Sequence, residues 1–184
     1  MAFVFDPFTG KLAFISPIRI FTAISDSSAV NTVTETSLIG SGIGSAIIPA
    51  NSLTIGKDIH IKLGGYYSVT SPAPTLRICV KLNGTTILDT TANLTSPPVT
   101  NLYTDIEAHL TIRSVGVSGT ATGYGGITLS TTHTSAYFDD FTPLLSPVAV
   151  DTTISNPVDV TATWGTANTL NSIIINNGFI ELSH

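Results

Sequence analysis

One stretch, residues 75–89, constrains the fold of this chain more than any other. Its first half alternates strictly between apolar and other side chains, with Leu76, Ile78, Val80 and Leu82 on one side and Arg77, Cys79 and Lys81 on the other. This period of two is typical of a strand with one buried face. Asn83 and Gly84 follow at once, and this pair favours the two positive φ angles of a type I′ turn. We therefore predict a β-hairpin that packs one face on a core.

The same alternation recurs at three other places, so the hairpin has strands to pair with. It appears at residues 57–69, 105–115 and 158–164, with turn-forming residues between the segments. In the last of these, the phase of the alternation places Trp164 on the core face. No segment shows a convincing helical period. The sequence therefore predicts an all-β fold, a jelly-roll-like β-sandwich of about eight strands with an extended N-terminal arm.

Two segments are harder to assign from their pattern. Residues 30–39 follow a Ser- and Thr-rich stretch, and we expect them to form the first strand of the sandwich. Residues 131–157 contain three prolines and no clear alternation, so we expect a long irregular loop. A loop of this length in one domain is usually functional or lies on a partner.

The composition limits the class of partner. Only 10% of the 184 residues are charged, against about 25% in typical proteins. A surface with few charges suits contact with other subunits. The net charge of −5 lacks the basic excess of a nucleic-acid-binding protein, so we expect no nucleic-acid partner. No apolar run reaches about 18 residues, so we expect no membrane insertion. The single cysteine, Cys79, permits no internal disulfide, and we interpret it as a packing residue.

The first part of the chain differs from the rest. Residues 1–28 hold five of the eight phenylalanines, and Pro7, Gly10 and Pro17 interrupt any regular element. We predict an N-terminal apolar arm at residues 1–28 and a β-sandwich domain at residues 29–184. The arm either lies over its own sandwich or docks on a neighbouring subunit. We favour docking, through the attachment residues Phe3, Phe5, Asp6, Pro7, Phe8, Leu12 and Phe14.

The sequence contains no recognisable catalytic motif. The histidines His60, His109, His133 and His184 are scattered without metal-ligand spacing, although His60 and His109 lie on polar strand faces and could converge after folding. The close acidic residues, Asp139 with Asp140 and Asp105 with Glu107, are interpreted as solvated charges, with bound calcium as the alternative. There is no Gly-x-Ser-x-Gly nucleophile elbow. We expect no metal, no cofactor and no enzymatic activity, with a small glycan hydrolase as the alternative.

Several segments, taken in order, resemble tailed-bacteriophage structural proteins with jelly-roll domains. They cover residues 48–53, 76–86, 111–116, 150–153, 159–164 and 171–173. The opening Phe-Asp-Pro-Phe-Thr-Gly-Lys-Leu at residues 5–12 is similar to a short attachment segment of such virion proteins. The resemblance implies a jelly roll, a homotrimer and no catalytic residues. It implies a role as head decoration or cement protein, neck or tail appendage, or receptor-binding tip.

From this resemblance we expect a non-enzymatic virion structural protein. It would be a trimeric capsid decoration or cement protein, or another accessory protein, held by its arm on capsid, neck or tail proteins of the particle. The alternative is a tail-fibre or appendage tip that binds a host surface glycan. Exposed aromatic side chains on loops would then contact the sugar, and the candidates are Tyr66, Tyr67, Tyr124, Tyr137 and Phe138.

Overall fold

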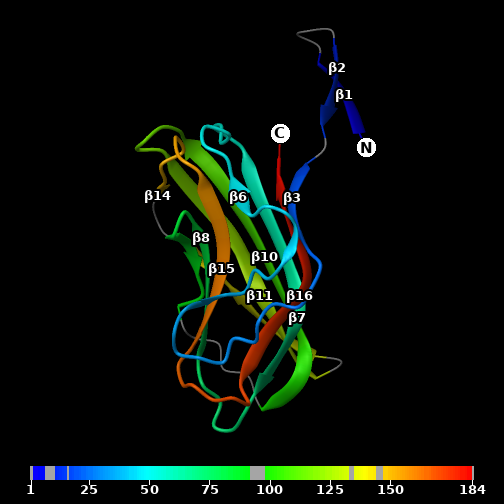
Figure 1. Cartoon of the computed structure of the whole chain (residues 1–184), viewed down its shortest axis with the longest axis vertical. Helices are drawn as coiled ribbons and strands as arrows, with labels where there is room; N and C mark the ends of the chain where they lie inside the picture. The colour runs from blue at the N-terminus through cyan, green and yellow to red at the C-terminus, as the bar shows by residue number, and fades with distance from the viewer. Residues whose placement is uncertain are drawn as a thin grey trace.

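The protein is an antiparallel β-sandwich. The computed structural model describes residues 2–6, 11–15, 17–91, 98–132, 135–143 and 147–183, with side chains from residue 17 onward except at positions 137, 139, 142 and 143. Within these ranges every regular element is a β-strand. Two sheets enclose one hydrophobic core (Figure 1). The predicted all-β sandwich class is confirmed, and the jelly-roll topology stays a prediction.

The larger sheet has eight strands. Their order is β12 (Ser135–Asp140), β11 (Thr120–Thr132), β10 (Val99–Ser114), β7 (Asp58–Val69), β16 (Ser172–Leu182), β3 (Ile18–Ala23) and β5 (Gly42–Gly44), and β14 (Val148–Ala149) also pairs with β11. The central strands β7, β10 and β16 are long, and each alternates between buried and half-buried positions for most of its length. This sheet therefore has one face on the core and one face on the outside.

The smaller sheet contains the predicted hairpin. It runs β13 (Thr142–Pro143), β9 (Thr85–Asp89), β8 (Leu76–Leu82), β15 (Asn156–Trp164) and β4 (Thr36–Ser37), and β6 (Ile47–Ile48) also pairs with β15. Leu82 pairs with Thr85 across a two-residue turn in which Asn83 has φ 49° and Gly84 has φ 75°. The two positive φ angles confirm the predicted type I′ turn.

The core lies between the inner faces of both sheets. Trp164 is 1% exposed, and its indole N–H donates a hydrogen bond to the Val30 carbonyl at 2.8 Å. The predicted inward orientation is thus confirmed, with the polar partner that a buried indole requires. Cys79 is also buried, and burial raises the pKa of its thiol to about 11. A thiol with this pKa stays protonated at neutral pH, which fits a packing residue.

The N-terminal boundary differs from the prediction. β1 (Ala2–Asp6) and β2 (Lys11–Ile15) form a two-stranded sheet of their own, drawn in Figure 1 beyond the sandwich. β3, however, lies within the predicted arm and pairs with β16 in the large sheet. Phe21 on β3 is buried in the core. The boundary at residue 28 is therefore wrong, because the sandwich already begins at Ile18.

Two other assignments change. Residues 30–39 contribute only an isolated bridge from Val30 to Ile173 and the two-residue β4. Residues 131–157 contain β12, β13 and β14 instead of a continuous irregular loop. β12 is an edge strand held by backbone pairing with β11, so it needs no apolar alternation of its own. In the two large sheets the structure describes nine strands of five or more residues, against about eight expected. None of the described elements is a helix that could span a membrane.

Candidate functional site

The outer face of the eight-stranded sheet gathers ionisable side chains from two central strands. On β10, Ile106, Ala108 and Leu110 point into the core, so the intervening side chains face outward. On β7 the same alternation applies. The register places His109 opposite His60 and Glu107 opposite Lys62. We call the resulting group the outer-face cluster; its members are Asp58, His60, Lys62, Asp105, Glu107 and His109.

The cluster is short of positive charge. Lys62 Nζ donates to Asp105 Oδ2 at 2.9 Å and to Glu107 Oε2 at 2.5 Å. The hydrogen bond from Lys62 lowers the pKa of Glu107 below its ordinary range. In turn, Glu107 and Asp105 raise the pKa of Lys62. With Asp58 included, three carboxylates face one lysine in this cluster.

The two histidines lie between these carboxylates. His109 Nδ1 lies 2.9 Å from Asp58 Oδ2, and His60 Nε2 lies 3.2 Å from Glu107 Oε1. Their rings are stacked, with centroids 4.3 Å apart and planes 8° from parallel. Each ring therefore has a carboxylate partner and is held in orientation by its neighbour across the strand pair.

Aromatic side chains extend this stack in both directions across the sheet. Tyr124 on β11 stacks on His109 at 4.9 Å, and Phe179 on β16 meets His60 edge-on at 5.5 Å. The Arg19 guanidinium on β3 lies 4.1 Å from the centroid of Phe179. Tyr124 is 63% exposed, so one end of the row is open to solvent. The row crosses five neighbouring strands and forms a polar and aromatic surface on this face.

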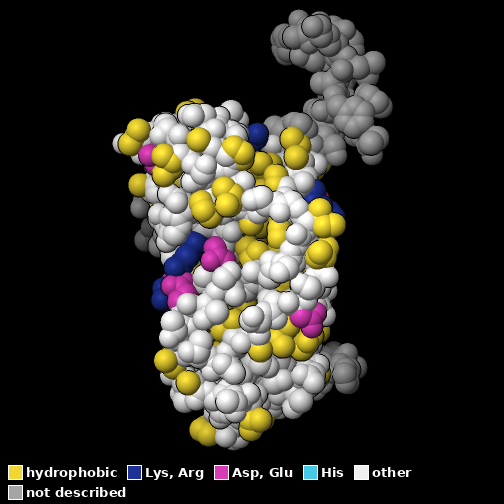
Figure 2. Space-filling view, in the orientation of Figure 1, with side chains coloured by type: hydrophobic (Ala, Val, Ile, Leu, Met, Phe, Trp, Pro, Cys, Tyr) yellow, Lys and Arg dark blue, Asp and Glu magenta, His cyan; other side chains and the backbone are white. Residues whose placement is uncertain are grey.

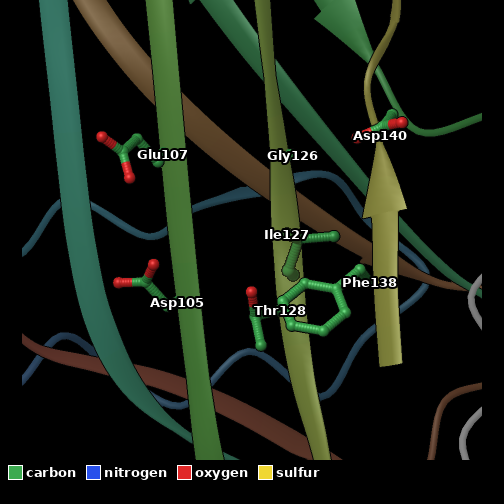
Figure 3. A pocket seen from close by; sticks show the side chains of 7 residues that line it. All are labelled: Asp105, Glu107, Gly126, Ile127, Thr128, Phe138 and Asp140. Atoms are coloured by element: carbon green, nitrogen blue, oxygen red, sulfur yellow. The ribbon is translucent and has the colours of Figure 1, made fainter. Parts of the chain in front are cut away.

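A shallow pocket of about 170 Å³ adjoins the cluster. It is lined by Asp105 and Glu107 from β10, Gly126, Ile127 and Thr128 from β11, and Phe138 and Asp140 from β12. Figure 3 shows the two β10 carboxylates one after the other along their strand, with Phe138 beside its register partner Thr128. Phe138 is 72% exposed. An exposed ring beside several hydrogen-bond acceptors is suited to a ligand with one apolar face and several hydroxyl groups.

The predicted glycan-binding residues do not form one site. Tyr124 and Phe138 are exposed on the outer face of the large sheet. Tyr67 is fully buried and donates its hydroxyl to the Ser130 carbonyl at 2.7 Å, so its assignment as an exposed contact is wrong. Tyr66 is half-buried and donates to Asp26 Oδ2 at 3.1 Å, a bond that raises its pKa. The side chain of Tyr137 lies outside the described residues.

Five of the seven predicted attachment residues lie on the two strands of the N-terminal hairpin. Phe3, Phe5 and Asp6 lie on β1, and Leu12 and Phe14 lie on β2. Only the backbone is described at these positions, and Pro7 and Phe8 lie outside the described residues. Their role in attachment stays a prediction.

Sequence reasoning did not assemble the outer-face cluster. It placed His60 and His109 on polar strand faces and treated Asp105 and Glu107 as solvated charges. The signal that was present is the period of two, which puts Asp105, Glu107 and His109 on one face of one strand. The missing information is the register against β7, which is set by pairing over long sequence distances.

Comparison with known proteins adds no further constraint. No protein-family model, no curated protein and no solved structure matches this chain. The function is therefore argued from the geometry and the sequence alone.

Proposed function

We propose that this chain is a non-enzymatic virion structural protein. In this role it is a trimeric capsid decoration or cement protein, or a similar accessory protein, attached to other proteins of the particle by its N-terminal hairpin. The observation that carries the proposal is the division of the chain between a small hairpin and a sandwich. Among the strands that the structure describes, β1 pairs only with β2, whereas β3 onward belongs to the two large sheets. Such a hairpin is suited to contacts beyond its own domain.

Apolar side chains near the hairpin support an interface in this region. Ile18, Ile24 and Ile43 are all more than half exposed. They lie on or beside β3 and β5, at an edge of the large sheet, and Ile43 is opposite Thr22 in the register. Sheet edges with exposed apolar groups readily pair with other chains unless they are covered. Another subunit or a particle protein would cover this edge.

The test is deletion of residues 1–16, which removes the hairpin and leaves β3 intact. If the hairpin serves attachment, the truncated protein should fold with an unchanged melting temperature and fail to join particles that lack the native copy. Phe5→Asp should have the same effect, whereas Val117→Asp, at an exposed position of the sandwich, should join normally. Normal incorporation of the truncated protein would overturn the attachment role. A drop of several degrees in melting temperature would instead indicate a strap over the sandwich.

The trimer is tested separately by sedimentation. The molecular mass of the full-length protein measured by sedimentation should be three times the 19.2 kDa mass of one chain. A single species at 19.2 kDa across the micromolar range would contradict the trimer without affecting the attachment test.

The pocket favours a second candidate function, binding of a host surface glycan. Sugar rings pack their apolar face on exposed aromatic side chains, and their hydroxyls donate to carboxylates. Phe138 supplies the exposed ring, and Asp105, Glu107 and Asp140 supply acceptors around one pocket. A glycan array probed with the protein should then give hits that Phe138→Ala removes and that an exposed control, Val117→Ala, retains. An array without hits would exclude this function for the glycans tested.

A further inference from the structure

We propose that His60, Glu107 and His109 bind one divalent transition-metal ion of the Zn²⁺ type on the outer face of the large sheet. Each residue offers one donor atom, and these three atoms lie within 4.8 Å of one another. Two imidazoles and a carboxylate are donors that Zn²⁺ accepts readily. The inference rests on this geometry alone and does not depend on a virion role.

The backbone places the three residues side by side before any ion arrives. Glu107 and His109 are two residues apart on β10 and therefore share a face. His60 is directly opposite His109 on β7. Both strands are central in the sheet, with neighbours on each side. Donors held by two paired central strands lose little freedom on binding, which favours metal affinity.

The separations are close to those of a tetrahedral site. With metal–donor bonds of about 2.0–2.1 Å, donors in a tetrahedral site lie about 3.3 Å apart. His60 Nε2 and Glu107 Oε1 are 3.2 Å apart, and His109 Nε2 is 4.0 Å from the same oxygen. The donor atoms of His60 and His109 lie within 4.8 Å of each other. Because the two rings are nearly parallel, both must turn out of their stack for their in-plane lone pairs to converge on one ion, a side-chain rotation that leaves the strands in place.

Asp58 prepares His109 as a ligand. Its carboxylate lies 2.9 Å from Nδ1 of His109 and accepts a hydrogen bond from the Nδ1–H group, and in this tautomer the Nε2 lone pair is free for a metal. Thr111 donates its hydroxyl to the other oxygen of Asp58 at 3.4 Å. A carboxylate behind a ligating histidine is the usual outer partner in zinc sites, because it fixes both tautomer and ring orientation.

The charge of the cluster also suits a cation. Asp58, Asp105 and Glu107 outweigh the single Lys62, so a divalent ion would neutralise the surplus. Lys62 holds the Oε2 atom of Glu107, whereas Oε1 faces His60. Lysine and metal can therefore use different oxygens of one carboxylate. Asp105 gives Lys62 a second partner if Glu107 turns toward the ion.

Three protein donors leave one coordination position for water or a ligand. Glu107 is 46% exposed and also lines the pocket beside Phe138. The open position is thus accessible to solvent and lies next to the pocket. A ligand with an oxygen or nitrogen donor could occupy the open coordination position and the pocket at the same time.

The test is calorimetric titration of the chelator-treated full chain, prepared without a polyhistidine tag. We expect saturable binding of one Zn²⁺ per chain and much weaker binding of Ca²⁺ and Mg²⁺, which prefer oxygen donors. His60→Gln, His109→Gln and Glu107→Gln should each lower the Zn²⁺ affinity by more than tenfold. Asp58→Asn should lower it by about 10- to 100-fold.

Glu35→Gln is the matched control. Glu35 also pairs with a lysine, Lys81, but on the six-stranded sheet, so its loss should leave Zn²⁺ affinity unchanged. Melting curves of each variant show whether it is folded. As a measurement that needs no variant, Zn²⁺ should shift the imidazole NMR resonances of His60 and His109. Absence of saturable binding, wild-type Zn²⁺ affinity in either histidine variant, or unshifted resonances of these two rings would overturn the proposal.

Discussion

The outer faces of the two sheets use their charged residues differently. On the six-stranded sheet, each described cation has a carboxylate of its own: Arg77 pairs with Asp89, and Lys81 pairs with Glu35 at 2.6 Å. The third carboxylate of this face, Asp159, accepts a hydrogen bond from Ser37 at 2.5 Å. Figure 2 shows basic and acidic side chains gathered in one area over β8 and β15. On the eight-stranded sheet, Lys62 donates to two carboxylates, and stacked histidine and aromatic rings lie on the same outer face.

This difference separates stability from recognition within one sandwich. One-to-one ion pairs at a surface contribute little to the free energy of unfolding. Because their charges are balanced, they also leave little net charge for a partner to neutralise. Surplus carboxylates, imidazoles and exposed rings contribute little to folding, yet they are the groups that bind ions and ligands. We therefore expect changes in the core side chains and the turn of the six-stranded sheet to alter stability, and changes in its surface ion pairs to alter it only slightly. Changes on the outer face of the eight-stranded sheet should alter binding.

The largest expected effect concerns the core beneath the six-stranded sheet. Trp164→Ala would remove a fully buried side chain of β15 and leave a cavity, so it should lower the free energy of unfolding by about 3–5 kcal/mol. Chemical denaturation measures this change. The native protein should also show blue-shifted tryptophan emission, since Trp164 is its only tryptophan. Emission already at the solvent-exposed maximum before unfolding would contradict the inward orientation.

The next effect concerns the turn between β8 and β9. Gly84 has φ 75°, and a Cβ placed there would meet no atom within 4 Å. Gly84→Val therefore adds no clash and tests the backbone conformation alone, at an expected cost of about 1–3 kcal/mol. Gly84→Asn is the control, because asparagine tolerates positive φ and should lose less. An unchanged melting temperature in the valine variant would rule out the type I′ turn as a source of stability.

Lowering the pH is expected to have a smaller effect on stability. The hydrogen bond from Arg77 lowers the pKa of Asp89, and Lys62 lowers that of Glu107. A carboxyl whose pKa is lower in the folded state stabilises the protein above its unfolded pKa of about 4, and this stabilisation is lost as pH falls through the folded pKa. Asp89→Asn should cost roughly 0.2–1 kcal/mol at pH 7.

This loss should shrink as pH falls below about 4, because the carboxyl takes up a proton first in the unfolded state and then, at lower pH, in the folded state. Glu107→Gln should lower the free energy of unfolding by less than Asp89→Asn does, because the side chain of Glu107 is 46% exposed and that of Asp89 only 17%. Urea unfolding at pH 7 and pH 3 gives both differences. A larger cost for Glu107→Gln would contradict the assignment of stability to the six-stranded sheet.

Where the sequence alternates regularly, it predicts the fold. The hairpin at residues 75–89 and the inward orientation of Trp164 follow from a local pattern, and both are confirmed. β5 could not be found in this way, because Gly-Ile-Gly has no alternation. A Cβ at Gly42 would lie 2.4 Å from the Thr22 carbonyl oxygen and equally near the Phe21 ring. This strand forms because glycine permits its backbone to approach β3 closely. That approach is a tertiary contact, which the local sequence pattern does not show.

The candidate site shows the same limit. The sequence alone predicts the polar faces of β7 and β10. The contact between His60 and His109, however, depends on the register between the two strands. The error at Tyr67 was avoidable. Tyr67 is in phase with Ile59, Ile61 and Leu63 on β7, so the period of two already pointed it toward the core.

The smallest effect on stability is expected at Phe138, and it tests the outer face of the eight-stranded sheet most directly. Phe138 is 72% exposed on the edge strand β12, so Phe138→Ala removes little buried surface and should change the free energy of unfolding by no more than about 0.5 kcal/mol. Tyr67→Ala is the matched comparison, because this aromatic is fully buried and should cost several times as much. Denaturation of both variants in parallel measures the ratio. Similar losses in the two would mean that the outer face supports the fold, and the separation of stability from recognition would then fail.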